Sequence, residues 1–122
     1  MTGGSANDNS VVARLTYGQI SVLLTGDAGA EVERQLVAGG APLRSTVLKV
    51  AHHGGCDAST AGFVEAVSPQ VAVISVGAGN RFGHPCAGVL ERLKDIPIYR
   101  TDKHGAVEII TDGVQVWVET ER

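Results

Sequence analysis

Residues 46–60 read TVLKVAHHGGCDAST, and this segment decides how the rest of the chain is interpreted. Its first half is an apolar run, which two adjacent histidines, His52 and His53, bring to an end before a glycine pair and a polar turn. Short apolar runs closed by turn residues are typical of buried strands. We therefore predict a strand over residues 47–51, with both histidines at the point where the strand leaves the sheet.

Two further apolar runs end in polar residues. SVLLTGD ends at Asp27, and VAVISV at residues 71–76 is followed by GAGNRFGHP, which contains His84. In open α/β sheets, ligands bind beyond the carboxyl ends of the strands. We therefore expect three strand ends to bring Asp27, His52, His53 and His84 to one edge, where they form part of a metal site.

The remaining pattern predicts the order ββαβαβαβββ. Glycine and Asp-Gly turns indicate β-hairpins at both ends of the chain. Between them, apolar residues at helical spacing, with residues typical of helix starts and ends, predict helices. The predicted helices fall at 28–38, 60–67 and 87–94, and a short strand falls at 98–101. Alternating strands and helices favour an α/β (α+β) fold, in which a mixed β-sheet has helices packed on at least one face.

Composition sets the broad class. The chain has 122 residues, 43% hydrophobic and 19% charged, which is typical of one globular domain and excludes a disordered chain. The net charge of −3 excludes binding of nucleic acid by bulk positive charge, so such a contact would be local or supplied by a metal. No apolar run is long enough to span a bilayer, and no secretory signal is visible. We expect residues 1–9 to be a flexible lead-in and residues 10–122 to form the domain.

Carboxylate and imidazole side chains are ligands that zinc and similar ions prefer, and hydrolytic sites often pair two such ions. Asp27 suits a bridging role, although as an isolated residue it is more typical of a helix N-cap. Neighbours on a strand point to opposite sides, so we expect only one of His52 and His53 to reach the metal. An exposed loop is the alternative for this pair. A Gly-Asp strand end together with a His-His-Gly strand end favours the metal site.

Several residues are candidates for other roles. His84 is either a turn histidine or a proton donor and phosphate contact, with Asn80 and Arg81 as further donors to substrate. Asp102 and His104 are interpreted as turn residues, in a loop that can lie near the site. Two cysteines, Cys56 and Cys86, could bind a structural zinc ion with the histidines or could form a disulfide, and the sequence leaves both open.

Five segments carry a resemblance to a known family. In chain order they are VVARL at 11–15, LLTGD at 23–27, LKVAHHG at 48–54, SVGAGNRFGHP at 75–85 and YRTDKHGAV at 99–107. Together they resemble the carboxyl-terminal metallo-β-lactamase-like domain of ComEC-type DNA-uptake competence proteins. The resemblance covers almost all of the chain from about residue 7 onward, and it is the combination of motifs that is specific.

The resemblance implies half of an αββα sandwich with one or two zinc or manganese ions at one edge. It implies a phosphodiesterase or nuclease that degrades the DNA strand not imported. Carried over by position, Asp27 is the bridging carboxylate, one of His52 and His53 is a metal ligand, and His84 lies near the scissile phosphate. The catalytic set would then be Asp27, His53 and His84. It further implies a soluble domain of a bacterial integral membrane protein.

One departure matters most. The family's His-x-His-x-Asp-His motif is absent, because no histidine precedes His52. The chain therefore resembles the second half of the domain, and we expect little catalysis without an amino-terminal half. The expected partners are that half and single-stranded DNA. The alternative is a non-catalytic binding or assembly module that forms a homodimer through the surface the missing half would cover, with or without a structural zinc site.

Overall fold

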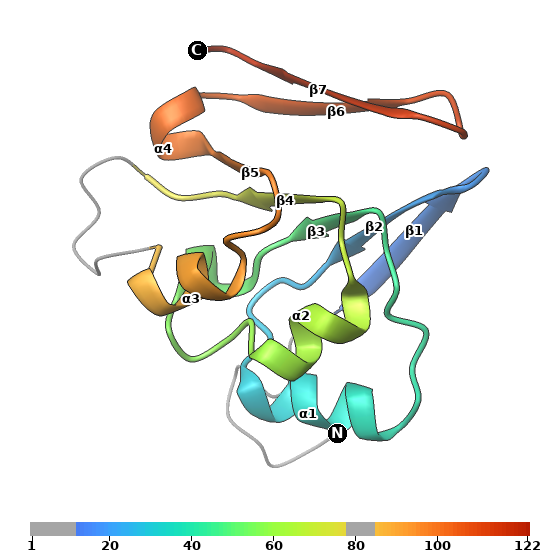
Figure 1. The fold of residues 1–122 in the computed structure, drawn as a ribbon, viewed down its shortest axis with the longest axis vertical. Coiled ribbons are helices and arrows are strands. Elements are labelled where there is room, and N and C mark those ends of the chain that lie inside the picture. The colour runs from blue at the N-terminus through green and yellow to red at the C-terminus, as the bar shows by residue number, and fades with distance from the viewer. Residues whose placement is uncertain (1–11, 78–84) are drawn as a thin grey trace.

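The computed structural model describes residues 12–77 and 85–122, apart from the side chain of His52. Five strands form a sheet in the order β1-β2-β3-β4-β5, and a separate hairpin pairs β6 with β7 (Figure 1). The sheet strands are β1 (Ala13–Tyr17), β2 (Ile20–Leu24), β3 (Val47–Lys49), β4 (Val71–Ile74) and β5 (Ile98–Arg100). The hairpin strands are β6 (Val107–Thr111) and β7 (Val116–Thr120). β1 is antiparallel to β2, whereas β2 to β5 are parallel, so the sheet is mixed as predicted.

Three helices connect the parallel strands, namely α1 (Ala30–Ala38), α2 (Ala61–Val67) and α3 (Ala87–Arg92). A 3₁₀ turn, η2 (Ala51–Gly54), follows β3, and the single turn α4 (Thr101–His104) lies between β5 and the hairpin. The predicted strand and helix order is confirmed apart from η2 and α4. These two elements are only four residues long, too short to produce a periodic signal.

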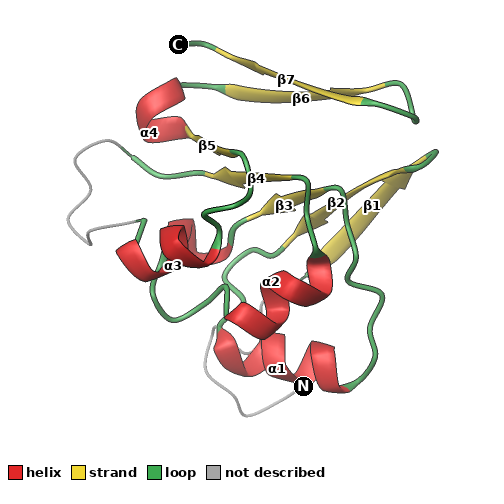
Figure 2. Ribbon diagram, in the orientation of Figure 1, coloured by secondary structure: helices red, strands yellow, loops and turns green. Residues whose placement is uncertain are grey.

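One face of the sheet carries the core. Alternate strand residues, such as Leu23, Leu48 and Ile74, are fully buried, and α1, α2 and α3 cover this face (Figure 2). Phe63 and Leu93 are the largest buried side chains that the helices contribute. The remaining members of this core are Leu43, Val50, Val64, Val67, Ala72, Val76 and Val89. Burial of this apolar area supplies most of the stability of the fold.

The β6–β7 hairpin lies on the opposite face of the sheet, as Figure 1 shows. Its tip is attached to the β1–β2 turn, since the N–H of Gln19 donates to the carbonyl of Gly113 at 2.6 Å. Between hairpin and sheet lies a cavity of about 290 Å³ with a mostly apolar lining. Beyond it, Leu15 and Tyr17 are 59% and 64% exposed. The hairpin therefore covers only part of this second face. In the described ranges no helix is long and apolar enough to cross a bilayer.

Candidate functional site

Four parallel strand ends meet at one edge of the sheet. Leu24 of β2 pairs with Lys49 of β3, which pairs with Val73 of β4, and Ile74 pairs with Arg100 at the end of β5. The segments that follow these strands therefore lie next to one another at the carboxyl edge. Three of these ends were predicted to carry site residues. The fourth, at β5, was predicted as a strand whose following residues, Asp102 and His104, form a turn that can lie near the site.

Asp27 lies in the turn after β2. The hydroxyl of Thr25 donates to the carbonyl of Lys49, which fastens this turn to the end of β3. The interpretation of Asp27 as a helix cap is wrong, because α1 begins at Ala30 and its N-cap is Gly29, without a side-chain hydrogen bond. The Asp27 side chain is exposed. The Asp27 side chain therefore lies at the edge formed by the C-terminal ends of the parallel strands, and it does not cap α1.

His53 is held in a defined orientation. Its Nδ1 lies 2.6 Å from the backbone carbonyl oxygen of Ser75, the first residue after β4. A carbonyl oxygen only accepts, so Nδ1 carries the proton, and the neutral ring then has its lone pair on Nε2. Metal-binding histidines show this arrangement, in which the second ring nitrogen donates to a carbonyl or carboxylate. The exposed imidazole of His53 is thus ready to coordinate a cation through Nε2.

The backbone of the histidine pair differs from the predicted one. His52 and His53 lie in η2 rather than on a strand, so the argument that they point to opposite sides does not apply. His53 has a φ of +52°, a left-handed conformation that is uncommon for residues other than glycine, although histidine, like asparagine and aspartate, adopts it more often than most. Such conformations concentrate at functional sites, where neighbouring structure holds them. The side chain of His52 lies outside what the structure describes.

Gly54 allows η2 to pack directly on the segment before α3. Its φ is +85°, and a Cβ at this position would lie 2.6 Å from the Cβ of Pro85. Its carbonyl accepts a hydrogen bond of 2.8 Å from the N–H of Cys86. Only glycine meets both the conformational and the steric requirement. The loop that carries His53 is in this way placed against the start of α3.

We expect Gly54→Ala to lower the free energy of unfolding by about 1–3 kcal/mol, because the methyl group both strains the backbone and overlaps Pro85. Gly62 is the matched control: it lies in α2, and a Cβ there meets nothing within 4 Å. Gly62→Ala should raise the stability by about 0.5–1 kcal/mol. Urea unfolding of the two variants checks the pair, and equal effects would contradict the packing argument.

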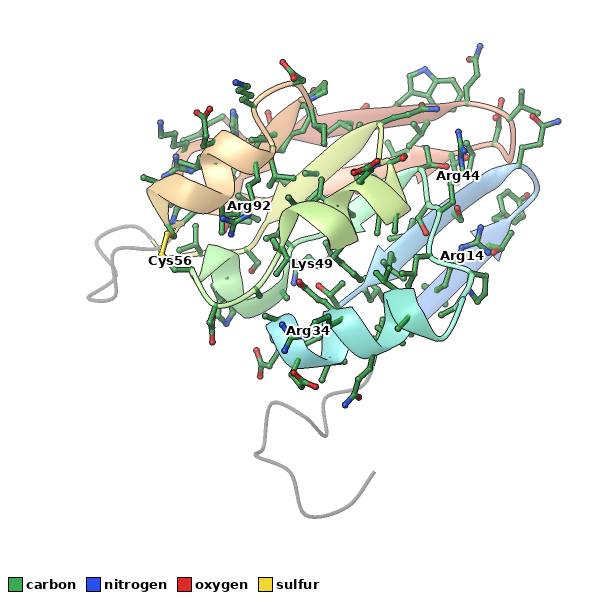
Figure 3. The ribbon with its side chains drawn as sticks, turned by 60° about the horizontal axis from the view of Figure 1, so that its bottom comes forward. Arg14, Arg34, Arg44, Lys49, Cys56 and Arg92 are labelled. Carbon is green, nitrogen blue, oxygen red and sulfur yellow. A yellow bond between two sulfur atoms is a disulfide. The ribbon has the colours of Figure 1, made fainter. Side chains whose placement is uncertain are left out.

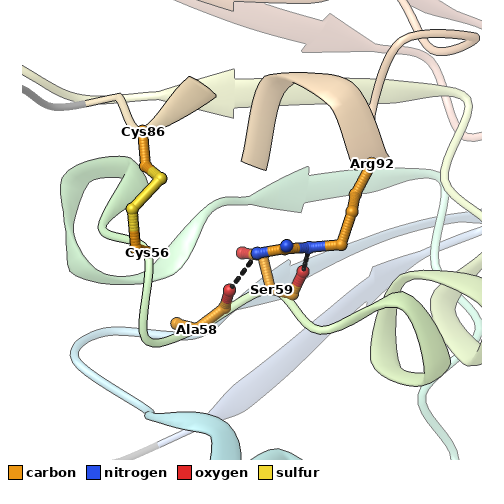
Figure 4. The surroundings of a disulfide bond; sticks show 5 residues. All are labelled: Cys56, Ala58, Ser59, Cys86 and Arg92. Carbon is orange, nitrogen blue, oxygen red and sulfur yellow. Dashed lines mark hydrogen bonds between the residues drawn. A yellow bond between two sulfur atoms is a disulfide. The ribbon is translucent and has the colours of Figure 1, made fainter. Parts of the chain in front are cut away.

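Cys56 and Cys86 form a disulfide, with a Cα–Cα distance of 5.3 Å. Figure 4 shows this bond between the loop after η2 and the start of α3. The disulfide alternative is therefore the one the structure contains. In this state the two sulfurs are not thiolates, and a structural zinc site that uses them is incompatible with it.

Residues 55–60 are held from two further sides. Arg92 of α3 donates to the carbonyls of Ser59 and Ala58, at 2.6 and 3.0 Å (Figure 4). Glu33 of α1, which is fully buried, accepts from the N–H groups of Ser59 and Thr60 and from the Thr60 hydroxyl. Thr60 is the N-cap of α2 without a side-chain cap bond, so Glu33 caps this helix from another element. The sequence analysis missed Glu33 and Arg92; a charged residue on the apolar face of a helix was the available signal for Glu33.

The end of β5 joins the same edge through Thr101. Its hydroxyl accepts from the N–H of Val76 at 2.7 Å and donates to the Val76 carbonyl at 2.8 Å. Asp102 and His104, predicted as turn residues, belong to α4. Arg100 pairs with both oxygens of Asp102, at 3.0 and 2.6 Å, and this guanidinium lowers the pKa of the Asp102 carboxyl below its ordinary value.

This pair predicts a pH dependence. The folded-state pKa of Asp102 is lower than its unfolded value, so its contribution is fully present above about pH 4 and is lost as pH falls through the folded-state value. Asp102→Asn should therefore be less stable than the parent at pH 7, and the difference should shrink as the pH falls below about 4. Thermal unfolding across this range is the measurement, and a difference that grows on acidification would contradict it.

The remaining candidates are not placed. Asn80, Arg81 and His84 lie outside the described residues. Within residues 12–77 and 85–122, the side chain of His52 excepted, no three histidine, cysteine, aspartate or glutamate side chains gather closely enough to hold a metal ion. What the described part presents at the carboxyl edge is an exposed carboxylate, Asp27, and an oriented imidazole, His53, on the ends of adjacent strands.

Comparison with known proteins gives consistent matches. The chain is 35% identical to ComE operon protein 3 of Bacillus subtilis (strain 168) over 106 residues, which cover 85% of this chain and 14% of that protein. It is 39% identical to Competence protein ComA of Neisseria gonorrhoeae over 105 residues, 84% of this chain and 15% of that protein. It is 38% identical to Recombination protein 2 of Haemophilus influenzae over 87 residues, 71% of this chain and 11% of that protein.

No protein-family model matches the chain. The chain spans only 11–15% of the length of these three relatives. The matches nevertheless cover most of this chain, at identities of 35–39%. The chain is therefore similar to a short segment of much longer bacterial proteins, whose names refer to competence and to recombination.

Proposed function

We propose that this chain contributes one half of a metal-dependent phosphodiesterase site that hydrolyses DNA in a ComEC-type competence protein. The observation that carries the proposal is the orientation of His53, whose Nδ1 donates to the Ser75 carbonyl and leaves Nε2 for a ligand, while Asp27 follows the neighbouring strand β2 at the same edge. The names of the relatives, which refer to competence and recombination, support DNA as the substrate class.

The donor set fits zinc or manganese. Carboxylate oxygens and imidazole nitrogens are ligands of both ions. Asp27 would bridge or bind the metal through its carboxylate, and His53, with His52 as the alternative, would bind through a ring nitrogen. The metal, when bound, supplies a water of lowered pKa that attacks the phosphodiester. His84, Asn80 and Arg81 are proposed to contact the phosphate of the substrate.

Two protein ligands hold a metal weakly, because affinity rises with the number of preformed ligands. We propose that an amino-terminal half of the same domain supplies the remaining ligands. Its place would be the second face of the sheet, where Leu15 and Tyr17 are exposed and the cavity under the hairpin lies open. The relatives have ample chain for this half, since the matches use at most 15% of it. The parent protein would be membrane-embedded.

Metal binding and cleavage in a longer protein that includes both halves test the proposal. We expect Asp27→Asn and His53→Gln each to lower bound zinc or manganese and to reduce cleavage of a single-stranded oligonucleotide by about 10²-fold or more. Asp95→Asn is the control, because this exposed carboxyl follows α3, away from the carboxyl edge. Unchanged metal content and cleavage in both site variants would refute the function.

The exposed apolar face also favours the second candidate, an assembly module. In isolation the chain would then form a homodimer through the face that carries Leu15 and Tyr17, because water-exposed apolar area of this kind promotes association. Sedimentation velocity in the presence of a metal chelator distinguishes the candidates. A dimer that Tyr17→Ser converts to a monomer supports assembly, and a monomer at all concentrations contradicts it.

A further inference from the structure

A second cavity, of about 280 Å³, lies at the amino edge of the sheet, opposite the candidate site. Its walls come from the β1–β2 hairpin, from the segment before β3 and from the connection between α2 and β4. The lining side chains are polar, and they are Arg14, Gln19, Ser21, Arg44, Ser45, Thr46, Ser68 and Gln70. Two of them carry a positive charge and none carries a carboxyl group. Figure 3 shows Arg14 and Arg44 near each other, far from Cys56.

Arg14 is fixed in place by protein acceptors. Its Nε donates to the carbonyl of Arg44 at 2.9 Å and to the hydroxyl of Ser45 at 3.3 Å. Its Nη1 and Nη2 reach the hydroxyls of Thr16 and Ser21, each at 3.3 Å. A guanidinium has five N–H groups, so one on Nη1 and one on Nη2 remain for a ligand. The orientation of the planar group is set before any ligand arrives, which lowers the entropic cost of binding.

Arg44 contributes a second positive charge to the cavity, and this charge is not needed to hold the fold together. Among the described residues, its side chain makes no hydrogen bond or ion pair, and it is exposed at the rim of the cavity. The hydroxyl-bearing residues Ser21 and Ser45, only 5% and 4% exposed, form the buried wall. The cavity lining has two guanidinium groups and no carboxyl group. The cavity is therefore locally positive, although the chain as a whole has a net charge of −3.

We propose that this cavity binds a phosphate-type oxyanion, held by the fork of Arg14 and by Arg44, with the hydroxyls of Ser21 and Thr46 as further donors. Charge-assisted hydrogen bonds from guanidinium groups match the geometry of phosphate oxygens. The oxyanion is either a phosphate of a nucleic acid strand or free inorganic phosphate. The proposal uses none of the residues of the metal site, so it stands or fails separately from the phosphodiesterase function.

The test compares Arg44→Gln with Arg34→Gln. Both remove one positive charge from an exposed side chain, but Arg34 lies on α1 and pairs with Glu31. The chain is titrated with inorganic phosphate, followed by NMR, and with a fluorescent single-stranded oligonucleotide, followed by anisotropy, in EDTA so that no metal-dependent binding or cleavage contributes. We expect Arg44→Gln to weaken binding about tenfold and Arg34→Gln to change it less than twofold.

The two ligands distinguish the source of the oxyanion. If the site takes a nucleic acid phosphate, oligonucleotide binding should weaken with salt, and Arg44→Gln should reduce the slope of log K against log salt by about one. If it takes free phosphate, only the phosphate titration should respond to Arg44→Gln. Arg14→Lys keeps the positive charge but loses the planar guanidinium group. It should weaken binding of the same ligand that Arg44→Gln affects. Equal effects of Arg44→Gln and Arg34→Gln, or no binding of either ligand at low salt, would overturn the proposal.

Discussion

Glu33→Ala is expected to lower the free energy of unfolding by about 3–5 kcal/mol, the largest effect of any single side chain outside the apolar core. The carboxyl group is fully buried and accepts three hydrogen bonds, two from the N–H groups of Ser59 and Thr60 and one from the Thr60 hydroxyl. Removing it leaves the buried N–H of Ser59 and the half-buried N–H and hydroxyl of Thr60 without their acceptor, and each buried unpaired donor costs about 1–3 kcal/mol. A loss of this size is a large share of the stability of a small domain.

Chemical denaturation followed by circular dichroism measures this loss. Glu31→Ala is the matched control, since Glu31 lies on the same helix but on its exposed side, paired with Arg34. Surface pairs of this kind contribute about 0–1 kcal/mol. Glu33→Gln should fall between the two, because its amide keeps one acceptor oxygen but presents N–H groups to the same donors. If Glu33→Ala were as mild as Glu31→Ala, the cap on α2 would have no energetic role.

Loss of the Cys56–Cys86 disulfide is expected to lower the free energy of unfolding by about 3–4 kcal/mol. The bond joins residues 30 positions apart, and in the chain-entropy account a closed loop of this length restricts the unfolded chain by that amount. The closed loop contains α2 and β4, which carry much of the core. The Cys56→Ser/Cys86→Ser variant, unfolded beside the oxidised parent, is the measurement.

The same experiment carries an internal control. A reducing agent should bring the parent to the stability of the double serine variant and should leave that variant unchanged. Because Arg92 and Glu33 still hold residues 55–60, the variant should keep its secondary structure and unfold in one transition. A double variant as stable as the oxidised parent would mean that the disulfide does not constrain the unfolded chain.

The sequence alone was sufficient for the order of the longer strands and helices and for the mixed sheet with helices packed on it. Apolar runs at β2, β3 and β4, each followed by turn residues, predicted the parallel strands, and the helices between them placed those strands in one sheet. Local periodicity is enough here because each element buries one face or both. The Asp-Gly turn of the last hairpin was likewise visible, and Asp112 accepts from the N–H groups of Val114 and Gln115 there. The same patterns brought Asp27 and the histidine pair to one edge.

What the sequence determined by itself was thus the order of the longer elements and the edge of the sheet to which the segments with Asp27 and His53 belong. Only the tertiary structure decided the details of that edge. It placed the histidines in a 3₁₀ turn, oriented His53 on Ser75, joined Cys56 to Cys86 and capped α2 with Glu33. The physical reason is range: secondary structure follows from neighbours within a few residues, whereas these contacts join residues 22 to 30 positions apart, and local periodicity carries no record of them.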